Sequence, residues 1–292
     1  MEGESKILFY FVLLYLQHIY ILFLVIFISI KIHNLYRNFT FFPIIIMYIF
    51  ILILLLLILL LIIFFVDGNY ILSLFNNIWK SSNSPLFYDT DKEWCKELRD
   101  NHEKITEEFI NYQKTHNIPI FGKISEQNMY LSDNEQPKWK VAALKIYGEE
   151  TNLSEHFPFT LSIIKKIPKC HLCMFSVVDP QKKIPLHQGI NACVLRYHLG
   201  LIIPKQKELC TLTLENEKVF WEKGKDIMFD DTFVHMVHNN TDEERVVLFL
   251  DIQKEFKNPI FNLLSDMFFY IFKKNSTVLN IYKKINEYNI YI

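Results

Sequence analysis

The sequence predicts a mainly β domain with flanking helices, preceded by two transmembrane helices. Two segments, 193–203 and 245–252, are rich in apolar and β-branched residues and have turn-forming residues on their flanks, a pattern that is typical of buried strands. Two long apolar runs lie near the N-terminus. These runs raise the hydrophobic fraction of the chain to 51%, so this average does not describe the remaining residues.

The two apolar runs cover about 7–30 and 41–66, and each exceeds the roughly 20 residues that a helix needs to cross a bilayer. A cleavable signal peptide fits the first run poorly, because the run is too long and no small-residue cleavage site follows it. The loop between the runs carries Lys31 and Arg37 and no acid. The positive-inside bias therefore places this loop in the cytoplasm and both ends across the membrane. We expect residues 1–67 to form a two-helix membrane anchor.

The remaining chain divides into three parts. Residues 68–135 are polar and aromatic and are predicted to be a juxtamembrane helical or linker region, with an amphipathic helix over 94–113. The β domain is expected over 136–256. A C-terminal tail, 257–292, contains an apolar run over 258–272 that is too short to span a bilayer and suits an amphipathic cap or a membrane-surface segment. The net charge of −1 gives no reason to expect a nucleic acid partner.

Two histidines are the candidates for metal ligands. His187 is followed nine residues later by Arg196, and His235 is followed ten residues later by Arg245. Two neutral imidazoles suit Fe(II), and guanidinium groups suit a small dicarboxylate. The alternative for each residue is structural, since a lone buried His is usually a satisfied core residue and an Arg at the start of a strand is usually exposed. The combination predicts a metal and a diacid in one site, which is the chemistry of 2-oxoglutarate-dependent oxygenases.

Three further residues extend this candidate site. Arg196 and His198 are two residues apart, so on a strand both side chains project from one face, where an anionic ligand could lie. Gly200 continues this face without a side chain and leaves room for something bulky. Arg245 could present a fork that binds a carboxylate in two places, and the hydroxyl of Ser176 could share that carboxylate.

Both stretches resemble the aspartyl/asparaginyl β-hydroxylase family, and the resemblance runs from about Trp139 to Asp251. The pieces that carry it are HxG at 187–189, RxHLGL at 196–201, WxxGK at 221–225 and FDDTFxH at 229–235. The resemblance implies a double-stranded β-helix (jelly roll) that uses Fe(II), 2-oxoglutarate and O2 to hydroxylate the β-carbon of Asp or Asn in protein substrates. By motif, His187 and His235 would be the iron ligands, and Ser176, Arg196, His198 and Arg245 would form the cosubstrate pocket.

One position departs from the usual oxygenase pattern. Most non-haem iron oxygenases supply two His and one carboxylate, but here the carboxylate position is Gly189 in the sequence HQG. The resembled family shares this loss, and a water or chloride would fill the position. Asp230 and Asp231 are the nearest carboxylates in sequence, and the family uses them to support the loop before the second His rather than as ligands.

Four smaller expectations concern structure. Gly224 is expected in a hairpin turn between strands that end near Trp221 and begin near Asp226. His238 should lie on the opposite face of its strand from His235. The five cysteines are compatible with one lumenal disulfide and a leftover thiol, and His171 between Cys170 and Cys173 is not expected to bind zinc, because the sequence has no second CxxC pair.

Together these observations predict a membrane-anchored Fe(II)- and 2-oxoglutarate-dependent dioxygenase that acts on Asp or Asn of a protein substrate. Its expected location is the endoplasmic reticulum membrane, with the β domain in the lumen. Two alternatives remain open: a hydroxylase of lipid acyl chains, and a membrane scaffold whose pocket no longer turns over.

Overall fold

A computed structural model describes residues 41–66, 84–124, 138–189 and 191–288. The chain divides into two compact units, Met1–Ile62 and Ile63–Ile292. The second unit contains all of the candidate site residues.

The described residues of the first unit belong to one helix, α2 (Phe41–Val66). This helix coincides with the second predicted membrane span, and its side chains are described for 44–59, nearly all of them exposed. Within the described part of the chain, no helix is identified as both long and apolar enough to cross a membrane. The predicted transmembrane helices are therefore not confirmed; the first, over about 7–30, lies outside the described residues.

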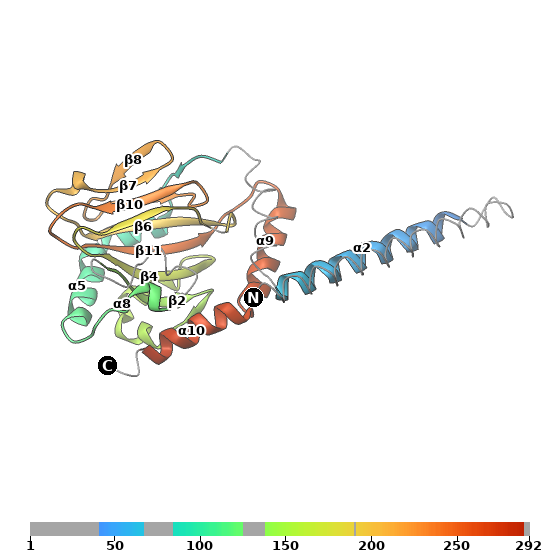
Figure 1. The fold of residues 1–292 in the computed structure, drawn as a ribbon, viewed down its shortest axis with the longest axis horizontal. Helices are drawn as coiled ribbons and strands as arrows, with labels where there is room; N and C mark the ends of the chain where they lie inside the picture. Colours follow the sequence, from blue (N-terminus) through green and yellow to red (C-terminus); the bar gives the residue numbers. More distant parts are fainter. Residues whose placement is uncertain (1–40, 67–83, 125–137, 190, 289–292) are drawn as a thin grey trace, which may run out of the picture. The chain divides into compact units, whose positions relative to one another are not determined.

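Two β-sheets form the second unit (Figure 1). In spatial order, the larger sheet consists of β1 (Phe87–Tyr88), β9 (Asp226–Phe229), β6 (Val194–Ile202), β11 (Arg245–Gln253), β4 (Cys170–Val178), β2 (Trp139–Ile146) and β3 (Glu149–Glu150). The smaller sheet consists of β5 (Lys183–His187), β10 (His235–Asn239), β7 (Cys210–Leu214) and β8 (Glu217–Phe220). All pairings between neighbouring strands are antiparallel.

The chain alternates between the sheets from β4 to β11. β4, β6, β9 and β11 lie in the larger sheet, whereas β5, β7, β8 and β10 lie in the smaller one. Eight strands that cross between two sheets in this order form a jelly roll. The predicted mainly β domain is confirmed, and its strands continue to the last residue of β11, Gln253.

The two faces of the larger sheet have different partners. Its outer face packs against helices α4 (Glu93–Asp100), α5 (His102–Gln113) and α8 (Pro158–Ile164), with Phe109 against Phe175 in the centre. Its inner face packs against the smaller sheet and holds the candidate site. Strand register explains this division, because alternate side chains of a strand point to opposite faces.

The remaining helices and turns pack around the two sheets. They are α6 (Phe121–Ile124), the 3-10 turns η2 (Asn152–His156) and η3 (Lys207–Leu209), and the C-terminal helices α9 (Pro259–Phe272) and α10 (Ser276–Tyr288). The predicted single helix over 94–113 is two helices. Asn101 ends the first one, because its backbone leaves the helical region and its side-chain amide donates to the carbonyl of Glu97, 2.8 Å away.

Two other expectations need correction. Gly224 has a positive φ of 70°, which suits glycine, but it connects β8 to β9 in the other sheet and so does not form a hairpin. The five cysteines are all buried free thiols, so the structure contains no disulfide at these residues. His238 is partly exposed on the face of β10 opposite His235, as predicted. His171 stacks on Phe269 and bonds Gln253.

Candidate active site

The two candidate metal ligands face each other on neighbouring strands of the smaller sheet. His187 is the last residue of β5 and His235 is the first residue of β10, and the two are cross-strand partners. Their ring centroids are 4.1 Å apart. A register shift directly after His235 marks an irregularity in the strand at this point. The topology thus brings together two residues that are 48 positions apart in the sequence.

Backbone carbonyls fix the tautomer of both rings. Nδ1 of His187 lies 2.8 Å from the carbonyl oxygen of Pro185, and Nδ1 of His235 lies 2.8 Å from that of Phe233. A carbonyl can only accept a hydrogen bond, so each Nδ1 donates and each Nε2 keeps its lone pair. This arrangement is typical of histidines that bind metals.

The electrostatic environment also favours neutral rings. Burial lowers the pKa of His187, and burial together with the neighbouring His187 lowers the pKa of His235 to about 3. A neutral imidazole is the form that binds a metal ion. The two rings therefore have the form and the orientation that an Fe(II) ligand requires, and the predicted role of His187 and His235 as ligands stays a prediction. Among the residues that the structure describes, no group of three or more His, Cys, Asp and Glu side chains is arranged to hold a metal, so no third protein ligand is evident.

Asp231 occupies the space next to Gly189 where most iron oxygenases have their third ligand. The amide of Gly189 donates to the carbonyl oxygen of Asp231, 2.6 Å away, and a Cβ atom added to Gly189 would overlap the Asp231 carboxylate. This carboxylate is buried and forms an ion pair with Arg196, with 2.7 Å between Oδ2 and Nη1. Burial raises the pKa of Asp231 to about 7, although Arg196 lowers it.

Arg196 is held by carboxylates on both sides. Besides Asp231, it bonds Asp251 through Nε at 3.1 Å and Nη2 at 3.3 Å, and its guanidinium lies over the ring of Phe249. Its side chain does project from the same face of β6 as His198, as predicted. Its role at the cosubstrate stays a prediction, because direct contact with a ligand would require Arg196 to leave one of these acids.

Arg245 has the opposite environment. Its side chain is 1% exposed and no ion pair joins it to any acid in the described chain. Nη1 lies 3.4 Å from the Ser176 carbonyl oxygen and 3.5 Å from its hydroxyl, the guanidinium lies 4.5 Å from the Trp221 ring centre, and Nε has no hydrogen-bond partner. A buried cation without a counter-ion is costly, so this arrangement suits an anionic ligand. The predicted association of Arg245 with Ser176 is therefore seen in the structure.

His198 supplies a second buried donor without a partner, in addition to Nε of Arg245. The indole N–H of Trp221 donates to Nδ1 of His198 over 3.3 Å, so the His198 proton lies on Nε2. This Nε2 is buried and has no partner. Burial, followed by the nearby Arg245, holds the pKa of His198 well below its usual value. Since Trp221 contacts both His198 and Arg245, these donors belong to one cluster, which a carboxylate could join.

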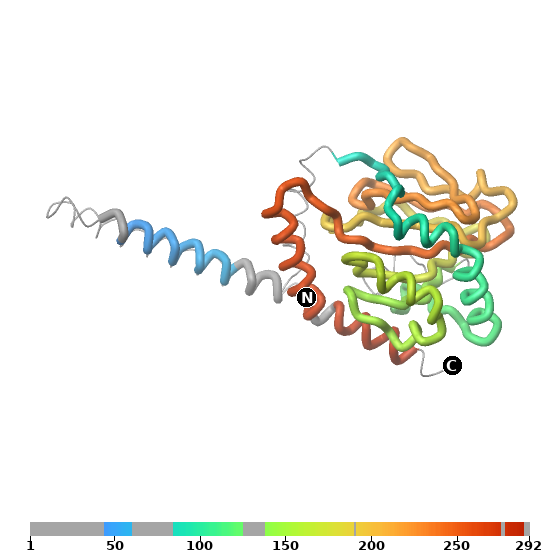
Figure 2. The backbone as a smooth tube through the Cα atoms, turned by 180° about the vertical axis from the view of Figure 1, so that it is seen from behind, coloured from blue at the N-terminus to red at the C-terminus, as the bar shows by residue number. Residues whose placement is uncertain are grey.

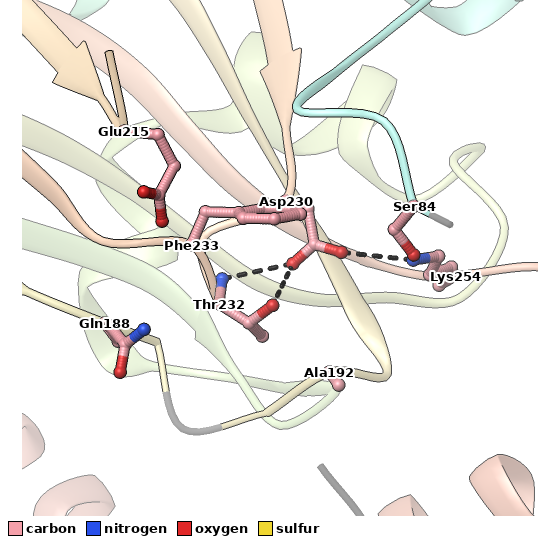
Figure 3. A pocket seen from close by; sticks show the side chains of 8 residues that line it. All are labelled: Ser84, Gln188, Ala192, Glu215, Asp230, Thr232, Phe233 and Lys254. Atoms are coloured by element: carbon pink, nitrogen blue, oxygen red, sulfur yellow. Dashed lines mark hydrogen bonds and ion pairs between the residues drawn. The ribbon is translucent and has the colours of Figure 1, made fainter. Parts of the chain in front are cut away.

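A pocket of about 180 Å³ is lined in part by residues that neighbour the two histidines in the sequence (Figure 3). Its lining includes Gln188, directly after His187, and Phe233, two residues before His235. Figure 3 shows the carboxylate of Glu215 and the amide of Gln188 on different sides of this pocket. The pocket is therefore a candidate entrance for a substrate.

Asp230 holds one wall of this pocket. Its Oδ1 accepts hydrogen bonds from the amide and the hydroxyl of Thr232, at 3.1 and 2.6 Å, and its Oδ2 lies 3.1 Å from Nζ of Lys254. Lys254 also donates to the hydroxyl of Ser84, 2.9 Å away. Asp230 thus supports the loop before His235, as predicted.

Two tryptophans donate hydrogen bonds within the site that the sequence does not predict. The sequence indicates Trp221 only as part of a motif and Trp139 only as the start of the resemblance. In the structure, the Trp139 indole donates to Ser176 Oγ over 3.0 Å. A buried Trp needs a partner for its N–H, and this requirement is the signal that could have indicated such contacts.

Gly200 does not leave room for a ligand, contrary to the prediction. It lies on the same face of β6 as Arg196, but a Cβ atom there would overlap the carbonyl oxygen of Glu222. The amide of Gly224 donates to the carbonyl oxygen of Gly200, 2.8 Å away. The space beside Gly200 is therefore filled by the chain itself rather than by a ligand.

Comparisons with known proteins identify the family of this chain. The family model described as aspartyl/asparaginyl beta-hydroxylase matches residues 99–255. An ornithine lipid ester-linked acyl 2-hydroxylase of Rhizobium tropici is 33% identical over 62% of this chain and 64% of its own length. Aspartyl/asparaginyl beta-hydroxylase of Homo sapiens is 32% identical over 40% of this chain, which spans 16% of that protein. A Pseudomonas putida prolyl-4-hydroxylase structure has a TM-score of 0.38 at 13% identity, covering 53% of this chain and 88% of its own.

Proposed function

Since the chain belongs to the aspartyl/asparaginyl beta-hydroxylase family, we propose that it is an Fe(II)- and 2-oxoglutarate-dependent dioxygenase that hydroxylates an unactivated carbon. The observation that carries this proposal is the pairing of two neutral, carbonyl-oriented histidines with a buried arginine that lacks a counter-ion. The first feature suits Fe(II), and the second suits the carboxylate of a small diacid.

Each residue then has a distinct task. His187 and His235 would hold Fe(II) through Nε2, and Arg245 would bind the distal carboxylate of 2-oxoglutarate beside the Ser176 hydroxyl. The Nε2–H of His198 would donate to the same ligand. When bound, Fe(II) would supply the activation of O2 that couples oxidation of 2-oxoglutarate to succinate and CO2 with hydroxylation of the substrate. The apolar walls between the sheets would exclude water from this ligand.

Removal of one imidazole tests the metal assignment. His187→Ala or His235→Ala should abolish succinate formation by the full chain in detergent, because each change removes half of the protein ligands. His238→Ala is the matched control, since this ring lies on the other face of β10. Near-normal succinate formation by either His187→Ala or His235→Ala, at ordinary iron concentration, would contradict the assignment.

For the substrate, we propose an Asp or Asn side chain of a protein. The support is the HQG pattern at 187–189, which this chain shares with the resembled protein hydroxylases, and the family match. The candidate entrance pocket has polar walls at Gln188 and Glu215, which could bind a peptide amide.

A lipid acyl chain is the second candidate substrate. The observation that favours it is the longer match, over 183 residues, to a hydroxylase that acts on ester-linked acyl groups of ornithine lipids. The exposed apolar side chains of α2 also favour a location next to lipids.

One assay separates these candidates. The full chain in detergent, with iron and 2-oxoglutarate, is given Asp- and Asn-containing peptides or ester-linked acyl lipids, and both succinate and the hydroxylated product are measured. Product from the peptides supports the first candidate, and product from the lipid alone supports the second. Absence of succinate with every substrate would support an inactive scaffold and contradict the proposed activity.

We further propose that the two apolar runs anchor the chain in the endoplasmic reticulum membrane with the second unit in the lumen. The support is the length of the runs and the basic loop between them. In sealed microsomes, added protease should spare the residues after Asp67 and should cut a tag inserted near Asn34. Digestion of the second unit without detergent would reverse this orientation.

A further inference from the structure

Helix α9 has two apolar faces. One face contains Phe268, Phe269 and Phe272, which are buried against the segment 192–194 just before and at the start of β6. Figures 1 and 2 show α9 at one end of the strands, on the opposite side of the unit from α5. This packing explains one apolar face, and it leaves the other without a described partner.

The second face is exposed over the whole length of the helix. Its large apolar side chains follow one another at intervals of three, four and three residues: Ile260 (62% exposed), Leu263 (60%), Met267 (50%) and Tyr270 (61%). Residues at this spacing form one stripe along a helix. A stripe of this size rarely faces water in a soluble protein and usually marks a contact with a partner or a membrane.

The charges around the stripe favour a lipid surface over a protein. The one acid on α9, Asp266, is neutralised by Lys169 at 2.5 Å and accepts a hydrogen bond from Gln253. Lys257 precedes the helix, and Lys273 and Lys274 follow it. An apolar face with lysines at its ends is typical of helices that lie in the interface of an anionic bilayer.

The lysines at the C-terminal end have room to reach lipid headgroups. Lys274 lies over the ring of Tyr270, with Nζ 4.3 Å from the ring centre, and it donates to the Tyr270 hydroxyl over 3.2 Å. Such a Tyr–Lys pair places an aromatic ring at the border of the apolar layer and a cation just outside it. Lys273 pairs with Glu149 at 3.4 Å, but both partners are exposed, so this contact can exchange for a headgroup phosphate.

Helix α9, which carries the stripe, packs beside the candidate substrate entrance. The inner face of α9 packs on Ala192, and Ala192 lines this pocket. The carbonyl oxygen of Cys193 accepts a hydrogen bond from the amide of Lys254, another lining residue, over 2.7 Å. Directly before His187, Leu186 is 64% exposed. The helix that carries the stripe therefore packs against Ala192, a residue that lines the pocket.

We propose that the outer face of α9, formed by Ile260, Leu263, Met267 and Tyr270, docks on the surface of an anionic bilayer. Docking by this face holds the pocket entrance next to the lipid headgroups, whichever substrate enters. The inference concerns contact of the β domain itself with the membrane, so it goes beyond the proposed reaction and does not depend on turnover.

Fluorescence of single sites tests this docking. The full chain is reconstituted into vesicles of phosphatidylcholine with phosphatidylserine, and an environment-sensitive dye is attached at Leu263→Cys or Met267→Cys. The native cysteines are all buried, so the introduced thiol is the accessible one. The matched control is Ile110→Cys, because Ile110 is a single exposed apolar residue on α5, on the opposite side of the unit.

Lipids that carry a quencher on the acyl chain should reduce the dye signal at 263 and 267 by about twofold or more and leave the signal at 110 unchanged. Omission of phosphatidylserine should weaken the quenching at 263 and 267. A second variant, Ile260→Glu combined with Tyr270→Glu in the Leu263→Cys chain, should remove the quenching without unfolding the domain, since both side chains are exposed.

Three outcomes would overturn the proposal. These are the absence of quenching at 263 and 267, equal quenching at 110, and a change in dye signal that depends on protein concentration but not on lipid quencher. The last of these would mean that a second copy of the chain covers the stripe. His187→Ala should leave the quenching intact, so failure of the proposed reaction and failure of the docking can be told apart.

Discussion

Two arginines on neighbouring strands of one sheet, Arg245 buried and Arg196 partly buried, have opposite environments. Arg196 on β6 lies between two carboxylates, Asp231 and Asp251. Arg245 on β11 has the Trp221 ring, the Ser176 oxygens and no acid. Burial lowers the pKa of Arg245 to about 10, whereas the same effect on Arg196 is outweighed by its two acids, so that its pKa is raised.

The difference lies in how each cation is neutralised. Arg196 is compensated within the fold and connects β6 to β11 and to the loop before His235. Arg245 is compensated only when an anion enters from outside. Sequence spacing alone gives the two residues the same appearance, because each follows a candidate ligand by about ten positions. The local counter-ions therefore support the proposal that the cosubstrate carboxylate binds at Arg245 rather than at Arg196.

The largest expected effect concerns stability. Arg196→Met should lower the free energy of unfolding by about 3–5 kcal/mol, because it leaves two largely buried carboxylates without their cation. Arg245→Met should leave this free energy unchanged or raise it, because it removes an uncompensated buried charge. Chemical denaturation of the full chain in detergent measures both. A destabilisation by Arg245→Met as large as that by Arg196→Met would show that Arg245 has a counter-ion within the fold.

The second expected effect concerns the cosubstrate. Arg245→Lys keeps the charge but loses the fork that binds a carboxylate in two places. The loss of one charge-assisted hydrogen bond should cost on the order of 1.5–3 kcal/mol, or roughly a ten- to hundredfold weaker apparent affinity for 2-oxoglutarate. Iron binding should change little.

Titration of 2-oxoglutarate at saturating iron checks this expectation. The matched variant is Arg196→Lys, which should affect the apparent affinity less than Arg245→Lys if Arg196 is structural. Overlapping titration curves for the wild type and Arg245→Lys would mean that the cosubstrate lies elsewhere.

The smallest expected effect isolates one hydrogen bond. Trp221→Phe keeps a ring beside Arg245 but removes the N–H that fixes the tautomer of His198. The cost should be about 0.5–1.5 kcal/mol, seen as a several-fold weaker affinity for 2-oxoglutarate. Trp139→Phe removes the N–H that binds Ser176 and serves as the comparison. If neither variant changes the affinity in the same titration, neither indole orients the cosubstrate site.

The sequence predicts the parts of this site that depend on local periodicity. Arg196 and His198 share a face because strand side chains alternate, and β11 begins at Arg245 as its β-branched run predicts. The pairing of His187 with His235 follows from the motifs through the resemblance. These features need only the direction of a strand and the order of the motifs.

The sequence does not predict contacts between segments that lie far apart in the chain and meet only through the topology of the two sheets. The partners of Arg196 come from the loop before β10 and from β11, and no spacing rule joins them to β6. The close approach of Glu222 to Gly200 depends on how the β8–β9 connection passes from one sheet to the other. The hairpin predicted at Gly224 is wrong for the same reason. Local turn signals do not tell which sheet the next strand joins.

The contact between Gly189 and Asp231 limits how this site could be converted into another kind of iron site. An acidic residue introduced at position 189 would collide with the carboxylate that already lies there. Shortening Asp231 would remove that collision, but it would also leave Arg196 with a single acid. An acidic residue at 189 would therefore require the Asp231 carboxylate to move, and this movement would change how Arg196 is neutralised.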